Sequence, residues 1–369
     1  MKLGEIATYV NGYAFKPSDW KESGLSIIRI QNLTGLSVQP NFYNGDYPTK
    51  IEINDGDILI SWSASLGVYL WKGGKALLNQ HIFKVVFDKV PINKKYFIYA
   101  VKYSLKNMTA KMHGATMKHI VKKDFDNIDI PYPQLNEQEK IVNVLEKCEI
   151  IIDSKKRQLE NLDILIKARF VEMFGDPVSN PKGLVKFPLR ELGELGRGVS
   201  KHRPRNDDCL LGGEYPLIQT GDVANSDLYI TEFQNTYSEL GLLQSKMWNK
   251  GTLCITIAAN IAKTAILQFD ACFPDSVVGF NANENTNNIF IHYWFSFFQE
   301  ILESQAPESA QKNINLKILS ELQVIVPDIQ YQKKFVDFVE QIDKSKVAIQ
   351  KSLDETQLLF DSLMQKYFG

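Results

Sequence analysis

Residues 136–175 read NEQEKIVNVLEKCEIIIDSKKRQLENLDILIKARFVEMFG, and they decide the architecture of the chain. Apolar side chains recur there at steps that mostly alternate between four and three residues, the spacing of a helix packed along a second helix. The seam consists of Ile141, Leu145, Cys148, Ile152, Leu159, Leu162, Ile166 and Phe170. Lys155 interrupts it once. A helix over about 137–172 would be roughly 54 Å long, so it requires a partner of equal length.

The partner is found in the same chain, where residues 330–369 read QYQKKFVDFVEQIDKSKVAIQKSLDETQLLFDSLMQKYFG. The two stretches overlay without a gap at a constant shift of 194 positions, which places Pro133 on Pro327 and Gln138 on Gln332. The second seam consists of Phe335, Val339, Ile342, Lys346, Ile349, Leu353, Thr356, Phe360, Leu363 and Tyr367. This internal repeat predicts two antiparallel helices that form an intramolecular coiled coil. A plain structural hairpin and a dimer zipper are the alternatives, and the gapless shift favours pairing within the chain.

Two globular regions alternate with these helices and also repeat. Gly56-Asp-Ile-Leu-Ile-Ser is echoed by Gly251-Thr-Leu-Cys-Ile-Thr, and Leu3-Gly-Glu-Ile by Leu189-Arg-Glu-Leu. Alternating apolar residues predict strands, and residues 92–112 are expected to form a helix. The predicted fold class is α+β, with two α/β-mixed globular domains, two long antiparallel helices and a pseudo-two-fold internal repeat. The expected segments are 1–135 (first domain), 136–175 (first helix), 176–329 (second domain, with a linker at 175–187) and 330–369 (second helix).

Composition narrows the class of protein further. The chain has 369 residues, 44% of them hydrophobic, and a net charge of −1, so nucleic-acid binding would have to use local basic patches. No apolar run reaches the length of a membrane span, and the N-terminus lacks the pattern of a secretory signal. The four cysteines form no Cys-x-x-Cys pair and the five histidines show no metal-ligand spacing. We therefore expect a cytoplasmic protein with no metal and no cofactor.

Three motifs, in the same order in both halves, resemble the specificity (S) subunits of type I restriction–modification enzymes. They are the run Gly56–Gly67, the run Leu78-Asn-Gln-His-Ile-Phe-Lys-Val, and Asp129-Ile-Pro-Tyr-Pro-Gln-Leu-Asn-Glu-Gln-Glu-Lys-Ile, whose second copy begins at Ile325. The resemblance covers the whole chain. It implies two target recognition domains, each reading half of a split double-stranded DNA sequence. It also implies docking of methyltransferase (M) subunits, expected to be two, and of restriction (R) subunits through the assembled complex, with no membrane involved.

The second copy departs from this pattern at two loops. It has Asp275-Ser276 where the first copy has Asn79-Gln80, and Asn260-Ile-Ala-Lys where the first copy has Ser65-Leu-Gly. The globular halves therefore diverge at these loops, whereas the helices stay in step.

Basic residues gather in two windows. Residues 89–123 contain nine lysines and no acidic residue, and residues 182–205 contain seven basic residues against two glutamates. Such clusters make phosphate contacts, whereas Arg, Asn and Gln can read base edges. The candidate DNA-binding residues are Arg29, Gln31, Asn32, Trp62, Asn79, Gln80, Lys111, Lys118, His119, Lys201, Arg203, Arg205, Gln219, Thr220, Lys312 and Asn313. The alternatives are a solvated lysine face, polar side chains that satisfy turns, and Trp62 in the core.

No catalytic motif is present in the sequence. A methyltransferase requires a glycine-bearing loop and an Asn/Asp-Pro-Pro-aromatic segment, and neither occurs; there is also no Walker-type loop and no nuclease-like carboxylate cluster. We expect a non-catalytic chain whose helices set a fixed gap between two half-sites, centred roughly one helical turn apart. Two alternatives remain: a coiled-coil adaptor that does not bind DNA, and a self-sufficient restriction enzyme.

Overall fold

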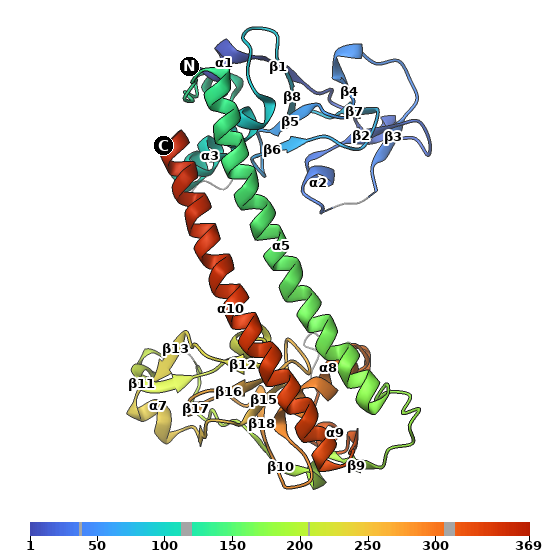
Figure 1. Cartoon of the computed structure of the whole chain (residues 1–369), viewed down its shortest axis with the longest axis vertical. Coiled ribbons are helices and arrows are strands. Elements are labelled where there is room, and N and C mark those ends of the chain that lie inside the picture. Colours follow the sequence, from blue (N-terminus) through green and yellow to red (C-terminus); the bar gives the residue numbers. More distant parts are fainter. Residues whose placement is uncertain (37–38, 112–119, 206, 306–313) are drawn as a thin grey trace. The chain divides into compact units, whose positions relative to one another are not determined.

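The computed structural model describes residues 1–36, 39–111, 120–205, 207–305 and 314–369. Its longest elements are the helices α5 (Leu135–Phe174) and α10 (Ile329–Phe368), of 40 residues each (Figure 1). The chain divides into two compact units, and the division cuts both helices midway. The first unit comprises Met1–Lys156 and Gln350–Gly369, and the second unit comprises Arg157–Ile349. Each unit therefore holds one globular region and half of each long helix.

The contacts within each unit show how the two helices pair. In the first unit, Ile141 and Leu145 near the start of α5 share a core with Met364 and Phe368 at the end of α10. In the second unit, Phe170 near the end of α5 packs edge-on against Phe335 near the start of α10, with ring centroids 5.4 Å apart. The start of each helix thus meets the end of the other. The predicted antiparallel pair between two mixed globular regions is confirmed.

The side chains named for the helix seam face inward to different degrees. Nine are buried: Ile141, Leu145, Cys148, Ile152, Ile166, Phe170, Phe335, Val339 and Leu353. Nine are half-buried: Leu159, Leu162, Ile342, Lys346, Ile349, Thr356, Phe360, Leu363 and Tyr367.

The first unit contains two four-stranded sheets and short helices. One sheet is antiparallel in the order β1-β8-β5-β6, and the other has the order β3-β2-β7-β4 with β2 and β7 parallel. The strands are β1 (Thr8–Asn11), β2 (Leu25–Ile28), β3 (Asn41–Tyr43), β4 (Glu52–Ile53), β5 (Ile58–Ser61), β6 (Gly67–Leu70), β7 (Ala76–Leu78) and β8 (Ile82–Val86). The helices are α1 (Leu3–Ile6), α2 (Ile30–Leu33), α3 (Lys94–Lys111) and α4 (Lys122–Asp126), with 3₁₀ turns η1 (Pro17–Asp19) and η2 (Thr49–Ile51).

The second unit repeats this topology. Its sheets have the orders β10-β18-β15-β16-β12 and β13-β11-β17-β14, with β11 and β17 parallel, and a separate pair β19-β9. The strands are β9 (Lys186–Pro188), β10 (Gly193–Arg197), β11 (Leu211–Leu217), β12 (Tyr229–Ile230), β13 (Asn235–Tyr237), β14 (Met247–Trp248), β15 (Leu253–Thr256), β16 (Thr264–Leu267), β17 (Ala271–Cys272), β18 (Val277–Ala282) and β19 (Gln323–Ile325). The helices are α6 (Thr220–Ala224), α7 (Glu239–Leu243), α8 (Asn288–Gln305) and α9 (Leu316–Ser320), with 3₁₀ turns η3 (Leu189–Glu191) and η4 (Asp208–Leu210).

A buried glutamine joins each globular region to the start of a long helix. In the first unit, the Gln138 side chain donates to Pro133 O at 2.9 Å and accepts from Asn93 N at 2.9 Å, directly before α3. In the second unit, the Gln332 side chain donates to Pro327 O at 2.9 Å and accepts from the Thr286 hydroxyl at 3.0 Å. Both glutamines are fully buried. A buried amide with satisfied partners specifies one geometry, because any shift leaves polar groups unpaired.

Candidate nucleic-acid interface

The first candidate site lies where two parallel strands of the first unit end. The register places Ile28 at the end of β2 beside Leu78 at the end of β7, and Asn79 N donates to Ile28 O at 3.1 Å. Carboxyl ends of parallel neighbours meet at one edge of a sheet. The structure therefore brings Arg29, Gln31 and Asn32 to the same edge as Asn79 and Gln80.

Local capping determines what these side chains can offer. Arg29 is the N-cap of α2, and its backbone N–H donates to Asn32 Oδ1 at 2.9 Å. The Asn32 oxygen is thus used within the turn, whereas the side chain of Gln31 is exposed. The Arg29 guanidinium lies over the Trp20 ring, with Cζ 5.3 Å from the ring centroid, a contact that orients its donors.

An exposed tyrosine at this edge was missed by the sequence analysis. Tyr13 N donates to Leu78 O at 2.9 Å and Gln80 N donates to Tyr13 O at 2.9 Å, so Tyr13 lies beside the Asn79–Gln80 turn. The residue is 48% exposed. Gly12 makes the approach possible, since a Cβ there would lie 2.0 Å from Asn79 O. The signal in the sequence was an aromatic residue directly after a glycine at the end of a short strand.

Trp62 mainly packs against other side chains of the first unit. Its ring stacks on Phe83 with centroids 5.6 Å apart, meets His81 edge-on, and donates from Nε1 to Asn11 Oδ1 at 3.3 Å. The ring is half-buried against the core of the first unit. This arrangement favours the core alternative for Trp62, although the residue borders the same edge.

The second unit builds the equivalent edge from different residues. Leu217 at the end of β11 pairs in parallel with Cys272 of β17, which brings Gln219 and Thr220 of the α6 turn near the segment that leads to Asp275. The Gln219 backbone N–H donates to Asp222 Oδ2 at 2.7 Å, the counterpart of the Arg29–Asn32 cap. The same turn geometry thus recurs with a different set of side chains.

Asp275 organises the basic loop of the second unit. Arg205 forms an ion pair with Asp275 Oδ1, Arg203 Nη2 lies 3.7 Å from Asp275 Oδ2, and Arg197 Nε donates to Asp275 O at 2.9 Å. Lys201 is exposed in the same loop, and its backbone N–H donates to Gln244 Oε1 at 2.7 Å. The Asp275 carboxylate thus keeps the two arginine side chains close together and offsets part of their positive charge.

The lysine window of the first unit is partly neutralised. Lys95 pairs with Glu146 of α5, Lys106 Nζ lies 3.6 Å from Asp361 of α10, and Lys122 Nζ lies 2.6 Å from Asp126. The acids come from segments distant in the sequence or from the next helical turn, so the window is less basic in space than along the chain. Lys118, His119, Lys312 and Asn313 lie outside the described residues, and the side chain of Lys111 is also not described.

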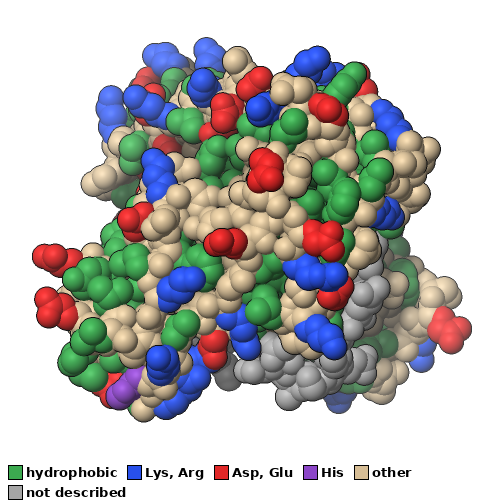
Figure 2. Space-filling view, turned by 90° about the horizontal axis from the view of Figure 1, so that it is seen from below, with side chains coloured by type: hydrophobic (Ala, Val, Ile, Leu, Met, Phe, Trp, Pro, Cys, Tyr) green, Lys and Arg blue, Asp and Glu red, His purple; other side chains and the backbone are tan. Residues whose placement is uncertain are grey.

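Figure 2 shows one face of the molecule, on which Lys and Arg side chains are interspersed with acidic and apolar ones. On this face the positive charge is local, in agreement with the net charge of −1. Local charge of this kind suits a protein that contacts a limited number of phosphates.

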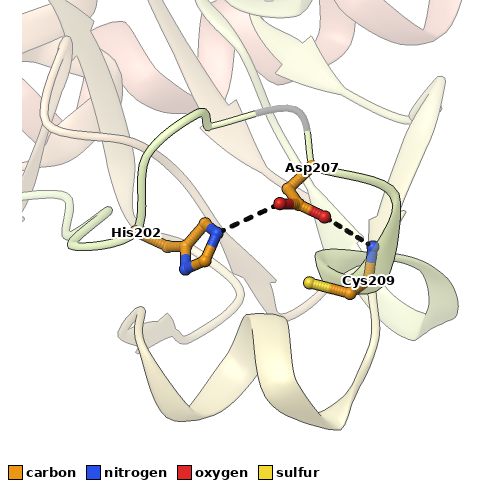
Figure 3. Close-up of side chains that lie close together, drawn as sticks. All are labelled: His202, Asp207 and Cys209. Atoms are coloured by element: carbon orange, nitrogen blue, oxygen red, sulfur yellow. Dashed lines mark hydrogen bonds and ion pairs between the residues drawn. The ribbon is translucent and has the colours of Figure 1, made fainter.

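Three side chains beside the basic loop could hold a cation. Ligand atoms of His202, Asp207 and Cys209 all lie within 4.8 Å of one another (Figure 3). Asp207 Oδ2 lies 3.3 Å from His202 Nε2, and Oδ1 accepts from Cys209 N at 3.1 Å as the N-cap of η4. The nearby carboxylate raises the pKa of the Cys209 thiol. Both carboxylate oxygens already have partners, so capping accounts for this cluster without an ion.

The described part of the chain contains no helical segment with both the length and the hydrophobicity of a membrane span. Two copies of one polar edge, carried on a shared pair of helices, are typical of a binding protein with two similar but unequal sites. Residues 1–163 and 181–356 match the family described as the type I restriction modification DNA specificity domain, and the chain belongs to that family. Specificity subunits are non-catalytic, which agrees with the expectation from the sequence.

Named relatives extend this result over nearly the whole chain. The specificity subunit of the type I restriction enzyme EcoBI from Escherichia coli is 24% identical over 398 residues, covering 99% of this chain and 83% of that protein. A putative MjaX specificity subunit from Methanocaldococcus jannaschii is 22% identical over 371 residues, covering 89% and 87%.

Solved structures show the same fold. The S subunit of a type I restriction–modification system from M. genitalium superposes with a TM-score of 0.57 at 16% identity, covering 100% of this chain and 95% of that chain. A chain from a study of complex assembly and conformational transition of the type I R-M system superposes with a TM-score of 0.61 at 15% identity, covering 100% and 96%.

Proposed function

We propose that the chain is the DNA-recognition subunit of a type I restriction–modification complex in the cytoplasm, with each globular region reading one half of a bipartite duplex target. The supporting observation is the repeated edge at the ends of β2 and β7 in the first unit and of β11 and β17 in the second. The two edges share a backbone plan but carry different side chains, with Asn79 in one and Asp275 in the other. Two sites with the same backbone geometry but different side chains would contact different bases, which suits an asymmetric target.

We infer that the helix pair acts as a spacer of set length. Residues 153–159 and 347–353 occupy the same repeat positions near the middle of α5 and α10. Deleting both segments removes one heptad from each helix and preserves the seam. The preferred gap is then expected to shorten by about three base pairs, from a rise of about 1.5 Å per residue and 3.4 Å per base pair. An unchanged gap would contradict the spacer.

Binding itself is tested by fluorescence anisotropy of the full chain on random duplexes at two salt concentrations, with and without a methyltransferase subunit. Phosphate contacts predict weaker binding at the higher salt concentration. A coiled-coil adaptor that does not bind DNA predicts no salt-dependent binding, and that result would exclude DNA recognition. A purified chain that transferred methyl groups or cut DNA would contradict a purely recognising role.

Exposed apolar pairs on the outer faces of the helices support docking of two methyltransferase subunits. Ile164–Leu165 on α5 and Leu358–Leu359 on α10 occupy equivalent repeat positions, and Ile164 and Leu358 are 63% and 68% exposed. Exposed apolar patches of this kind mark protein contacts. Restriction subunits would then join through the assembled complex.

We expect Leu358→Ser with Leu359→Ser to remove one methyltransferase copy and leave the other bound at Ile164–Leu165. Native mass spectrometry of the complex measures this as a change from two copies to one. Loss of both copies, or of neither, would contradict one docking site per repeat.

A further inference from the structure

Lys346 occupies a seam position of α10 and is only 12% exposed at its side chain. Its ammonium lies 2.8 Å from Asp163 Oδ1 on α5 and 2.7 Å from Asp227 Oδ2, in the turn between α6 and β12. One side chain therefore joins both long helices and the globular region of the second unit. Each contact is a charge-assisted hydrogen bond, which has a narrow geometry.

The first unit has no lysine at the equivalent position. The repeat shift of 194 places Lys346 on Ile152, which is buried, and Asp163 on Gln357. Among the described residues of the first unit, the ion pairs that reach the long helices each join two elements: Lys95–Glu146 joins α3 to α5 and Lys106–Asp361 joins α3 to α10. The contact of Lys346 with two carboxylates thus has no counterpart at the equivalent repeat position, which points to a role that the repeat does not require twice.

Stability alone does not account for this lysine. Burial disfavours the charged ammonium, but the two carboxylates outweigh that effect and raise the pKa of Lys346, so it stays charged at neutral pH. Asp163 is half-exposed and Asp227 is largely exposed, and a cavity of about 410 Å³ borders all three side chains, so water screens the pairs. Even fully buried ion pairs are often no more stable than apolar replacements, so the net stabilisation from these partly exposed pairs is small.

A better explanation is that Lys346 selects one register of α10 against α5. A slip of α10 by one turn would present Ile342 or Gln350 to Asp163 in place of the ammonium. Both ion pairs would be lost, so the ammonium adds a polar penalty to any such slip, beyond the apolar contacts that the seam itself would lose. A single polar residue in an apolar seam is a known way to select one register.

We propose that Lys346 is a positioning residue that sets the register of α5 against α10 and orients the second globular region on them. Because the helix pair is the proposed spacer, this inference rests on the proposed function for its consequence: Lys346 determines how sharply the protein distinguishes targets with the correct gap from targets one base pair longer or shorter.

The first test measures register without DNA. Ile164→Cys on α5 and Val347→Cys on α10 each carry a nitroxide spin label; both positions are exposed and both lie in the second unit. Cys209→Ser in the same protein removes the exposed native thiol. Pulsed electron paramagnetic resonance on the full chain is expected to give one narrow distribution of the distance between the two labels. Lys346→Met broadens or shifts it, and Lys346→Arg restores it. Lys155→Met is the matched control, because Lys155 also interrupts the seam, and it leaves the distribution unchanged. An unchanged distribution in Lys346→Met overturns the proposal.

The second test measures discrimination with the methyltransferase subunits present. The ratio of affinities for the correct gap and for gaps changed by one base pair is expected to fall by about tenfold in Lys346→Met, a typical coupling between linked sites. Lys155→Met keeps the ratio. A broadened distance with an unchanged ratio overturns the role in specificity. If the wild type binds no DNA, the proposed function is refuted. If Lys346→Met still broadens the label-to-label distance in that case, the role of Lys346 in setting the helix register stands.

Discussion

The two units share a backbone plan and differ in what they place on it. Buried glutamines at equivalent positions, Gln138 and Gln332, tie each globular region to a long helix. At the strand ends the first unit has Asn79 and the second has Asp275 with two arginines. At the seam the first has Ile152 and the second has Lys346. The two units thus share the buried glutamine contacts but differ in the side chains at their strand-end edges. This is expected if the glutamines maintain one shared geometry and the two edges bind different ligands.

The largest expected difference between the units is in their cores at the helix junction. Phe170 contacts Phe174, Phe290 and Phe335 in the second unit, whereas its repeat counterpart in the first unit is Met364. Phe170→Ala is expected to cost about 4 kcal/mol, because a buried ring leaves a large cavity. Hydrogen exchange should show the loss in the second unit. Met364→Ala should cost about 3 kcal/mol and act in the first unit, because Met364 is buried in that core. If either change affected both units equally, the two cores would not be independent.

The glutamine joints predict a similar loss in either unit. Gln138→Ala and Gln332→Ala each leave a buried carbonyl and a buried donor unpaired, so each is expected to cost about 2 kcal/mol. Thermal unfolding measures the size, and exchange at the start of α5 or α10 locates it. Gln134→Ala is the control, since Gln134 is exposed near the same helix start. A loss below about 0.5 kcal/mol, the scale of ordinary surface changes, would show that the joint is not specific.

Acid should weaken the second unit selectively. Burial lowers the pKa of His292 to about 4, and its Nδ1 lies 3.0 Å from the Thr264 hydroxyl. The unfolded chain binds a proton near pH 6.5 but the folded chain does so only near pH 4, so stability is full above about pH 6.5 and falls as the pH drops towards 4. The loss is about 2 kcal/mol after allowance for screening by the adjoining cavity.

The repeat supplies a control for the histidine. The counterpart of His292 in α3 is Ile98, which cannot titrate. His292→Ile should flatten the acid limb measured by hydrogen exchange in α8, and exchange in α3 should keep its pH dependence in both proteins. An acid limb that persists in the variant would assign it to other groups.

The smallest expected effect concerns the basic loop. Asp275→Asn removes the carboxylate that pairs with Arg203 and Arg205, so binding to random duplex should strengthen by about fivefold, roughly 1 kcal/mol. Anisotropy titrations at several salt concentrations measure it, with a steeper salt dependence expected. Glu232→Gln, the same charge change at an exposed position of the second unit, should alter binding by less than about twofold. Weaker binding in Asp275→Asn would show that the carboxylate orients the arginines more than it neutralises them.

Sequence reasoning located the helices closely and the candidate site incompletely. The shift of 194 positions and the seam predicted helices near 136–175 and 330–369, and the structure has them at 135–174 and 329–368. Arg29 and Asn79 are separated by fifty positions in the chain and meet because β2 and β7 pair in parallel. Short strands carry weak periodicity, so neither this pairing nor the exposure of Tyr13 beside it could be read from the pattern.

The sequence by itself determined the duplication and the helical seam, because both are periodic and depend on local spacing. The tertiary structure decided which charges matter. Lys155 and Lys346 interrupt the seam in the same way, but only the fold brings Asp163 and Asp227 to Lys346 from 183 and 119 positions away in the chain. It likewise placed Glu146 and Asp361 beside lysines that looked uncompensated along the sequence. Charge pairing depends on distance in space, and that distance is set by long-range packing that no local pattern records.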